Sequence, residues 1–172
     1  MEWILESQRL RFRRIEPADF LSLCELLQDK EVMYAWEHAF SEEDILNWME
    51  RTFARYQVDG FGHFAAIEKG TGAFLGVIGP IIEVVEDVSY TGLGYILKKE
   101  YWGKGYATEG AKACMEHAFT VLGAEMVIAE IRPENLSSRK VAERLGMRVE
   151  REFVKHYRGK DMPHLIYSKT KE

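Results

Sequence analysis

The spacing of apolar side chains along the chain predicts strands and helices in alternation. Residues 9–15 alternate between arginines and apolar residues, which is the pattern of a half-buried strand. Six further runs are rich in apolar and β-branched residues and are bounded by turn residues, as strands are. The predicted strands are residues 9–15, 61–68, 73–85, 90–97, 126–131, 148–157 and 162–169.

Four other segments repeat apolar residues every three or four positions, the spacing of one helix face. The first predicted helix opens at Pro17 and Asp19. The second is capped by Ser41, which forms a capping box with Asp44 and precedes a helix that ends near residues 59–60. The third, residues 107–122, has the clearest pattern. A fourth runs through Leu145, with either Asn135 or Ser137 as its cap.

The predicted order is therefore β-α-α-β-β-β-α-β-α-β-β, an α/β domain with one mixed sheet. No repeat or linker composition interrupts residues 1–172, so we expect a single domain. Pro80 lies inside a predicted strand but has no N–H group. We therefore do not expect it at a central position that is paired on both sides.

Composition excludes some classes of function. With a formal net charge of −5, the chain does not resemble a general nucleic-acid binder, which is normally basic. Met1–Arg14 lacks the apolar core of a signal peptide, and no run approaches the roughly 18 apolar residues of a membrane span. We expect a cytoplasmic protein without membrane or nucleic-acid partners, in which Cys24 and Cys114 are free thiols.

The segment Tyr101–Gly110 carries the strongest chemical signal. It connects a predicted strand to the best predicted helix through a glycine-rich turn, which directs backbone N–H groups and a helix N-terminus at one point. A phosphate or pyrophosphate fits such a site. A P-loop would need Ser or Thr after Lys104, and a dinucleotide fingerprint would need glycine in place of Thr108. A nucleotide-binding domain that uses this loop stays open as an alternative.

Residues 102–107, W-G-K-G-Y-A, match the pattern Q/R-x-x-G-x-G/A at Gly105 and Ala107. Together with Asn135, Ser138 and the Leu145–Gly146 pair, this chain resembles the GNAT family of N-acetyltransferases. Its loop is similar to that of the branch that acetylates ribosomal-protein N-termini. The resemblance implies a single mixed, mostly antiparallel sheet flanked by about four helices, and acetyl-CoA as cosubstrate.

The resemblance also implies a set of cofactor-binding residues. Backbone N–H groups of the loop and the dipole of the long helix would hold the pyrophosphate, while strand backbone would pair with the pantetheine amides. The backbone amide of Leu97 is the expected oxyanion donor. The predicted cofactor-binding residues are Tyr95, Ile96, Leu97, Trp102, Gly103, Lys104, Gly105, Tyr106, Ala107, Thr108, Asn135 and Ser138.

The chain departs from the family pattern at two kinds of position. Trp102 stands in the Q/R place. Many relatives have a tyrosine where this chain has Ala142 and a glutamate where it has Gly92. Without these two proton-handling side chains, we expect a water relay to a general base. Glu83 and Tyr90 are the predicted base residues, with Glu86 and His63 as further candidates.

The sequence thus predicts an enzyme that moves an acetyl group from acetyl-CoA to a primary amine by direct attack in a ternary complex. The acceptor is expected to be a protein N-terminus or a small amine, bound between the first two helices, the 83–90 loop and the final hairpin. Four aromatics are candidates to line this cleft: Trp36, Trp48, Tyr90 and Tyr157. We expect no metal and a monomer or homodimer. The alternative from a different class is a module that binds acyl-CoA without turnover.

Overall fold

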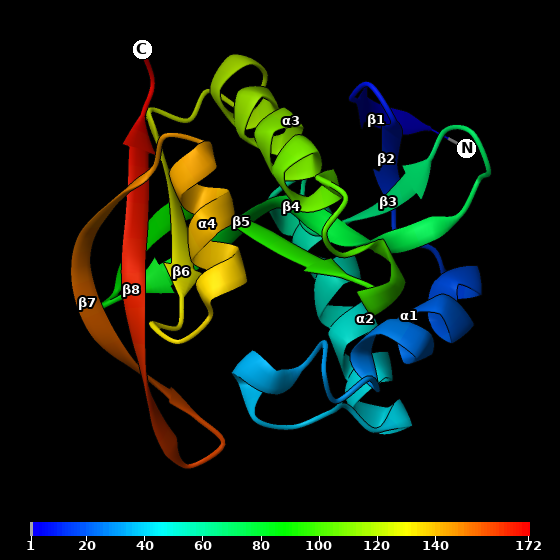
Figure 1. Ribbon diagram of the computed structural model, residues 1–172, viewed down its shortest axis with the longest axis horizontal. Helices are drawn as coiled ribbons and strands as arrows, with labels where there is room; N and C mark the ends of the chain where they lie inside the picture. Colours follow the sequence, from blue (N-terminus) through cyan, green and yellow to red (C-terminus); the bar gives the residue numbers. More distant parts are fainter. Residues whose placement is uncertain (1) are drawn as a thin grey trace.

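An eight-stranded sheet runs through the computed structural model, which describes residues 2–172 (Figure 1). Of the range expected to form one domain, only Met1 lies outside the described residues. Within them the strand order is β1-β2-β3-β4-β5-β6-β8-β7, and every neighbouring pair is antiparallel except β5 and β6. The strands are β1 (Trp3–Glu6), β2 (Leu10–Arg14), β3 (Phe64–Glu68), β4 (Phe74–Val85), β5 (Val88–Leu97), β6 (Met126–Ile131), β7 (Arg148–Tyr157) and β8 (Lys160–Thr170). The prediction of one mixed, mostly antiparallel sheet is confirmed.

Four α-helices accompany the sheet in the described residues: α1 (Phe20–Leu27), α2 (Glu42–Val58), α3 (Tyr106–Thr120) and α4 (Leu136–Arg144). The predicted capping box is confirmed, because the Asp44 amide donates to Ser41 Oγ at 3.1 Å. Asn135 is the cap of α4, and its Oδ1 accepts from the Ser138 amide at 3.4 Å. In Figure 1, α3 and α4 lie in front of the sheet, whereas α1 and α2 pack against each other at the lower right.

Small residues let α3 lie close to the sheet. Ala111, Cys114 and Ala118 are completely buried. At Gly110 a Cβ atom would lie 2.4 Å from Cδ1 of Ile78 in β4, so a larger residue would have to displace the Ile78 side chain or the helix. This contact fixes the position of the helix N-terminus that follows the glycine-rich loop.

The sequence pattern missed one strand. β1 has the sequence W-I-L-E, without alternation of polar and apolar residues, and it forms by pairing with β2 across a register irregularity. Its pairing partner, rather than its own pattern, decides its conformation. A smaller difference is that β3 begins at Phe64 instead of residue 61.

The expectation for Pro80 is confirmed. β4 is a central strand, but its ladder with β3 ends at the pair Ile78–Phe64. Pro80 lies beyond that pair and faces only Leu93 of β5, so its missing N–H group leaves no partner unsatisfied.

The remaining observations concern the thiols and the membrane. Cys24 and Cys114 are free, as expected; Cys114 is fully buried and Cys24 partly so. Within residues 2–172, no helix combines the length and the apolar character needed to cross a membrane.

Candidate active site

The two parallel strands at the centre of the sheet separate and leave an open edge. β5 and β6 pair at Thr91–Val127 and Gly92–Ile128, after which β5 continues to Leu97 without a partner on that side among the described residues. On its other side, the Lys98 amide donates to Leu75 O at 2.8 Å. Because antiparallel ladder bonds alternate, the N–H and C=O groups of Tyr95 and Leu97 point into the gap.

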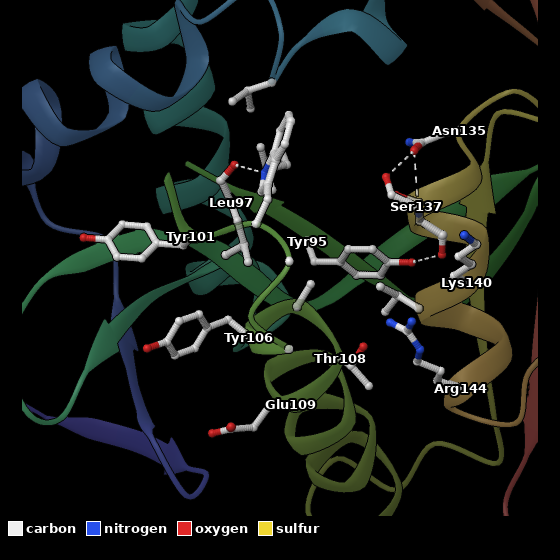
Figure 2. A pocket seen from close by; sticks show the side chains of 18 of the residues that line it. Tyr95, Leu97, Tyr101, Tyr106, Thr108, Glu109, Asn135, Ser137, Lys140 and Arg144 are labelled. Atoms are coloured by element: carbon white, nitrogen blue, oxygen red, sulfur yellow. Dashed lines mark hydrogen bonds between the residues drawn. The ribbon is translucent and has the colours of Figure 1, made fainter. Parts of the chain in front are cut away.

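The carbonyl and the amide of Leu97 differ in what they contact. The indole Nε1 of Trp102 donates to Leu97 O at 3.0 Å, which leaves the amide as the open group of that residue (Figure 2). The tryptophan in the Q/R position therefore has a structural role: it lies over the gap and caps one edge carbonyl.

The glycine-rich loop enters α3 through two left-handed residues. Gly103 has φ +73° and Gly105, the N-cap of α3, has φ +81°, a region that strains any residue with a Cβ. The loop amides and the first turn of α3 carry the positive end of the helix dipole. The arrangement is suited to an anionic group such as a diphosphate.

The side chain of Arg9, the residue immediately before β2, holds this loop. Arg9 donates from Nη1 to Lys104 O at 3.0 Å and from Nε to Glu109 at 2.7 Å, and its guanidinium lies 4.0 Å from the centre of the Tyr106 ring. Ser7 Oγ also donates to Glu109, at 2.6 Å. Burial opposes ionisation of Glu109, but the hydrogen bonds from Ser7 and Arg9 outweigh it and keep its pKa below the usual range. We call this set, Ser7, Arg9 and Glu109, the loop latch.

The sequence did not indicate the latch. The alternating arginines indicated only a half-buried strand. Instead each arginine has a structural partner: Arg9 in the latch, Arg11 against the Trp3 ring at 4.6 Å, and Arg13 in a two-bond contact with Asp19 at 2.8 and 2.9 Å.

The start of α4 forms the opposite wall of the gap. Asn135 Oδ1 accepts from Tyr34 Oη at 2.8 Å as well as from its own helix. Tyr95 Oη donates to Ser138 O at 3.0 Å, which ties β5 to α4 across the gap (Figure 2). Since the oxygen of Asn135 is already paired, its amide nitrogen is the group that can donate to a ligand.

These elements enclose a cavity of about 790 Å³, which we call the cofactor cavity. Eleven of the twelve predicted cofactor-binding residues line it: Tyr95, Ile96, Leu97, Trp102, Gly103, Gly105, Tyr106, Ala107, Thr108, Asn135 and Ser138. The side chain of Lys104 does not line it. Sequence reasoning missed further lining residues: Val32, Tyr34, Trp36, Tyr101, Glu109, Ser137, Lys140, Val141 and Arg144.

A second cavity of about 320 Å³ adjoins the first, and we call it the acceptor cavity. Five residues line both: Trp36, Tyr95, Ile96, Asn135 and Ser138. Of the four aromatics expected in the cleft, Trp36, Trp48 and Tyr157 line the acceptor cavity, whereas Tyr90 does not.

Two carboxylates of the acceptor cavity interact directly. Glu83 on β4 and Glu130 on β6 both line it and hydrogen-bond to each other. Burial, followed by this bond and the Glu130 charge, raises the pKa of Glu83 to about 8. Lys155 Nζ lies 3.6 Å from Glu130, whose side chain is 7% exposed. Glu83 was predicted; Glu130 and Lys155 were not, because they come from strands distant in sequence.

The other base candidates lie in different surroundings. His63 lines the acceptor cavity, with its ring 5.5 Å from that of Trp48, and burial, helped by the Arg55 charge, lowers its pKa to about 4. Tyr90 lines neither cavity and packs on a small apolar cluster with Val85 and Ile128. Glu86 is outside both cavities too, in the β4–β5 turn, where it pairs with Arg151 at 2.6 Å.

Comparison with known proteins decides the family. Residues 9–148 match the model of the acetyltransferase (GNAT) domain. The chain belongs to the GNAT family. It is 31% identical over 169 residues to the uncharacterized protein YkkB of Bacillus subtilis, covering 96% of this chain and 94% of that protein.

Solved structures agree with this assignment. The GNAT-family acetyltransferase from Bacillus anthracis superposes with a TM-score of 0.81 at 26% identity and covers 96% of this chain and 97% of that chain. RimL, a ribosomal L7/L12 alpha-N-protein acetyltransferase solved with coenzyme A, shares the fold with a TM-score of 0.77 at 19% identity, covering 98% of each chain. The expected GNAT fold is therefore confirmed, and this GNAT protein is an acetyltransferase.

The family uses acetyl-CoA, and the cofactor cavity of this GNAT protein fits that molecule. Thr108 Oγ1 is buried at the first turn of α3 and has no hydrogen-bond partner among the described residues. A buried hydroxyl without a partner is costly, and a phosphate oxygen beside the helix N-terminus would satisfy it. Lys140 and Arg144 line the same cavity from α4 and supply positive charge (Figure 2).

Proposed function

We propose that this GNAT acetyltransferase moves an acetyl group from acetyl-CoA to a primary amine by direct attack in a ternary complex. The observation that carries the proposal is the shared wall of the two cavities, formed by Trp36, Tyr95, Ile96, Asn135 and Ser138. Two ligands that enter from the two cavities would meet there. Holding two reactants in place in this way removes much of the entropic cost of their encounter.

In the cofactor cavity, the chain's own groups would bind each part of the cosubstrate. The amides of residues 103–108, the α3 dipole and the Thr108 hydroxyl would hold the pyrophosphate. The open edge of β5 would pair with the amides of the pantetheine arm, and Asn135 would donate to that arm from the other wall. Acetyl-CoA, once bound, supplies the thioester.

An oxyanion donor is available on the same strand edge. Leu97, the predicted donor, lines only the cofactor cavity, whereas Tyr95 lines both cavities and its amide points to the same side. We therefore assign pairing with the pantetheine to the Leu97 amide. The Tyr95 amide, at the junction of the cavities, is the better placed to stabilise negative charge on the thioester oxygen.

For proton removal we assign the role of base to Glu83. It lines the acceptor cavity, and a carboxyl with a pKa of about 8 is a stronger base than an ordinary carboxylate, so its ionised form, which increases as the pH rises toward 8 and above, can accept a proton from an ammonium group. A water molecule would relay the proton. Tyr90 lies outside both cavities, so the proposal gives it no direct part.

The acceptor cavity holds a small amine or the first residue of a peptide. Its volume of about 320 Å³ and its aromatic wall, with Trp36, Trp48 and Tyr157, fit either. A protein N-terminus is the acceptor named for RimL, with which this chain shares the fold. We carry both acceptors into the experiment.

The test is to mix the protein with acetyl-CoA and primary amines of both kinds, and to follow the release of free thiol. The panel contains short peptides with free α-amines and small aliphatic amines, with N-acetylated peptides as blanks. We expect release with at least one kind and none with the blanks. Binding of coenzyme A without release from any amine would overturn the proposal in favour of an acyl-CoA-binding module. Stabilisation by NAD or ATP but not by coenzyme A would favour a nucleotide-binding domain.

A further inference from the structure

Two carboxyl groups from non-adjacent strands meet across the strand that separates them. Glu83 lies on β4, Glu130 lies on β6, and β5 runs between these strands. Their contact passes over Gly92 of β5. A Cβ atom at Gly92 would lie 2.5 Å from Glu83 Cγ and 3.5 Å from the backbone oxygen of Ile128. Any other residue at this position would occupy the space through which Glu83 reaches Glu130.

The surroundings of the pair favour one shared proton. Two neighbouring carboxylates repel each other when both are ionised, so the first proton that the pair binds is shared between them and is held more tightly than by an ordinary carboxyl. Charged and titratable groups face the pair from each neighbouring element: Arg55 from α2, Lys155 from β7, His164 from β8 and His63 before β3. The nearest cation, Lys155, pairs with Glu130 and thereby offsets the remaining negative charge.

We propose that Glu83 and Glu130 act as one proton-accepting unit for the acceptor amine, and that Gly92 is the opening in β5 that makes the unit possible. This inference rests on the proposed function, since it concerns the base of that reaction. Glu83 is the catalytic residue of the unit. Glu130 is a positioning residue, which holds Glu83 toward the acceptor cavity and tunes its affinity for protons.

The protons and electrons balance in the following way. With both carboxyls ionised, the Glu83–Glu130 unit takes one proton from the bound ammonium, through a water molecule, and holds it between the two carboxyls, while the freed nitrogen lone pair attacks the thioester carbon. The C–N bond forms, the C–S bond breaks, and the thiolate takes the second proton from the nitrogen. The unit then returns its extra proton to solvent, so one amide, one thiol and one released proton result from each turnover.

The test compares pH profiles of kcat/KM for the wild type, Glu83→Gln and Glu130→Gln. Two acceptor amines of different basicity separate the enzyme's titration from that of the acceptor. For Glu83→Gln we expect kcat/KM to fall by about 100-fold or more, as for removal of a general base. The limb of the pH profile that reports the enzyme's own titration should disappear. For Glu130→Gln we expect the limb to move down by about one pH unit or more, because an amide can hydrogen-bond to Glu83 without its like charge.

Glu86→Gln is the matched control. It removes a carboxylate from the neighbouring β4–β5 turn, outside both cavities and paired with Arg151, and should leave the profile unchanged. A wild-type profile in Glu130→Gln, or near-normal activity in Glu83→Gln, would overturn the inference. If the wild-type protein released no thiol with any amine, that result would instead count against the proposed function.

A third variant tests the opening. In Gly92→Ala the added methyl group must displace the Glu83 side chain, so we expect the pH profile of Glu130→Gln with an unchanged Kd for coenzyme A.

Titration of ¹³C-labelled glutamate carboxyls detects the shared proton without turnover. In the wild type one carboxyl should titrate well above the ordinary range, and in Glu130→Gln that titration should move to lower pH while burial still keeps it above the ordinary range. A normal titration of all carboxyls in the wild type would overturn the inference independently of activity.

Discussion

The two cavities of this acetyltransferase are built from different parts of the chain. In the cofactor cavity, the groups to which we assign the cosubstrate are mainly backbone: the open edge of β5, the loop amides and the N-terminus of α3. The acceptor cavity presents side chains from α2, β4, β6, β7 and β8. A backbone site depends on the conformation of a few glycines, whereas a side-chain site depends on which strands the fold places together. Substitutions in the two cavities should therefore differ in how they change ligand binding, stability and pH dependence.

The largest expected effect comes from Gly105→Val. This residue is the left-handed N-cap of α3, and a β-branched side chain there is strained and would lie close to Arg9. The strain and the displaced amides should cost about 2–3 kcal/mol of binding, or roughly 30- to 150-fold in the Kd of coenzyme A. Isothermal calorimetry measures this change.

The matched control is Gly123→Val. Gly123 has φ +74° after the end of α3, with no atom near its missing Cβ, and it is remote from both cavities. It should lower the free energy of unfolding and leave the Kd unchanged. Equal loss of binding in both variants would show that general destabilisation, not the loop backbone, is responsible.

The second effect concerns the loop latch. Arg9→Gln removes the ion pair with Glu109 and the bond to Lys104 O, which should loosen the loop and weaken coenzyme A binding about tenfold, or about 1.4 kcal/mol. Arg13→Gln is the control, because its pair with Asp19 lies away from the loop and should affect only stability. An unchanged Kd in Arg9→Gln would mean that the loop keeps its shape without the latch.

The third effect has opposite signs in two measurements. Thr108→Val keeps the shape but removes the buried hydroxyl that has no partner among residues 2–172. The free energy of unfolding of the ligand-free protein should rise by about 1 kcal/mol, while coenzyme A should bind several-fold more weakly. A hydroxyl that never contacts the ligand would change the first quantity and not the second.

The smallest effect is in the acceptor cavity. Burial lowers the folded-state pKa of His63 to about 4, below its unfolded value near 6.5, so the unfolded state binds more protons between these pH values. The stability due to neutral His63 is complete above pH 6.5 and is lost as the pH falls toward 4. His63→Phe should reduce this loss by less than about 1 kcal/mol at pH 6, as measured by urea unfolding. Parallel pH dependence in both proteins would refute the depressed pKa.

The contrast between the cavities explains what the sequence could show. Gly103, Gly105 and Asn135 are adjacent to the elements they start, so local patterns located nearly the whole cofactor cavity. The contact between Glu83 and Glu130 depends on β6 lying beside β5, which follows from strand order and not from spacing along the chain. The Gly92 opening was visible as a glycine in a strand, but its purpose depends on a side chain from β4.

The same limit applies to the fold. Helices α2, α3 and α4 carry their own start signals, and β6 and β7 their own apolar or alternating runs, so these elements were predicted within a few residues. β1 lacks such a signal because it depends on its neighbour. The contacts of Arg9, just before β2, and of Arg13 in β2 were not predicted for a related reason: their partners, Glu109 and Asp19, cannot be identified before the fold is known.

The short junction of β5 and β6 has a mechanical consequence. Among the described residues, the pairs Thr91–Val127 and Gly92–Ile128 are the only ladder positions that connect β1–β5 with β6–β8. A molecule stretched along the free edge of β5 and touching α4 would brace the two halves of the sheet against each other. The bound cosubstrate would then add to the contacts that connect β1–β5 with β6–β8. These contacts would be lost when the product leaves after each turnover.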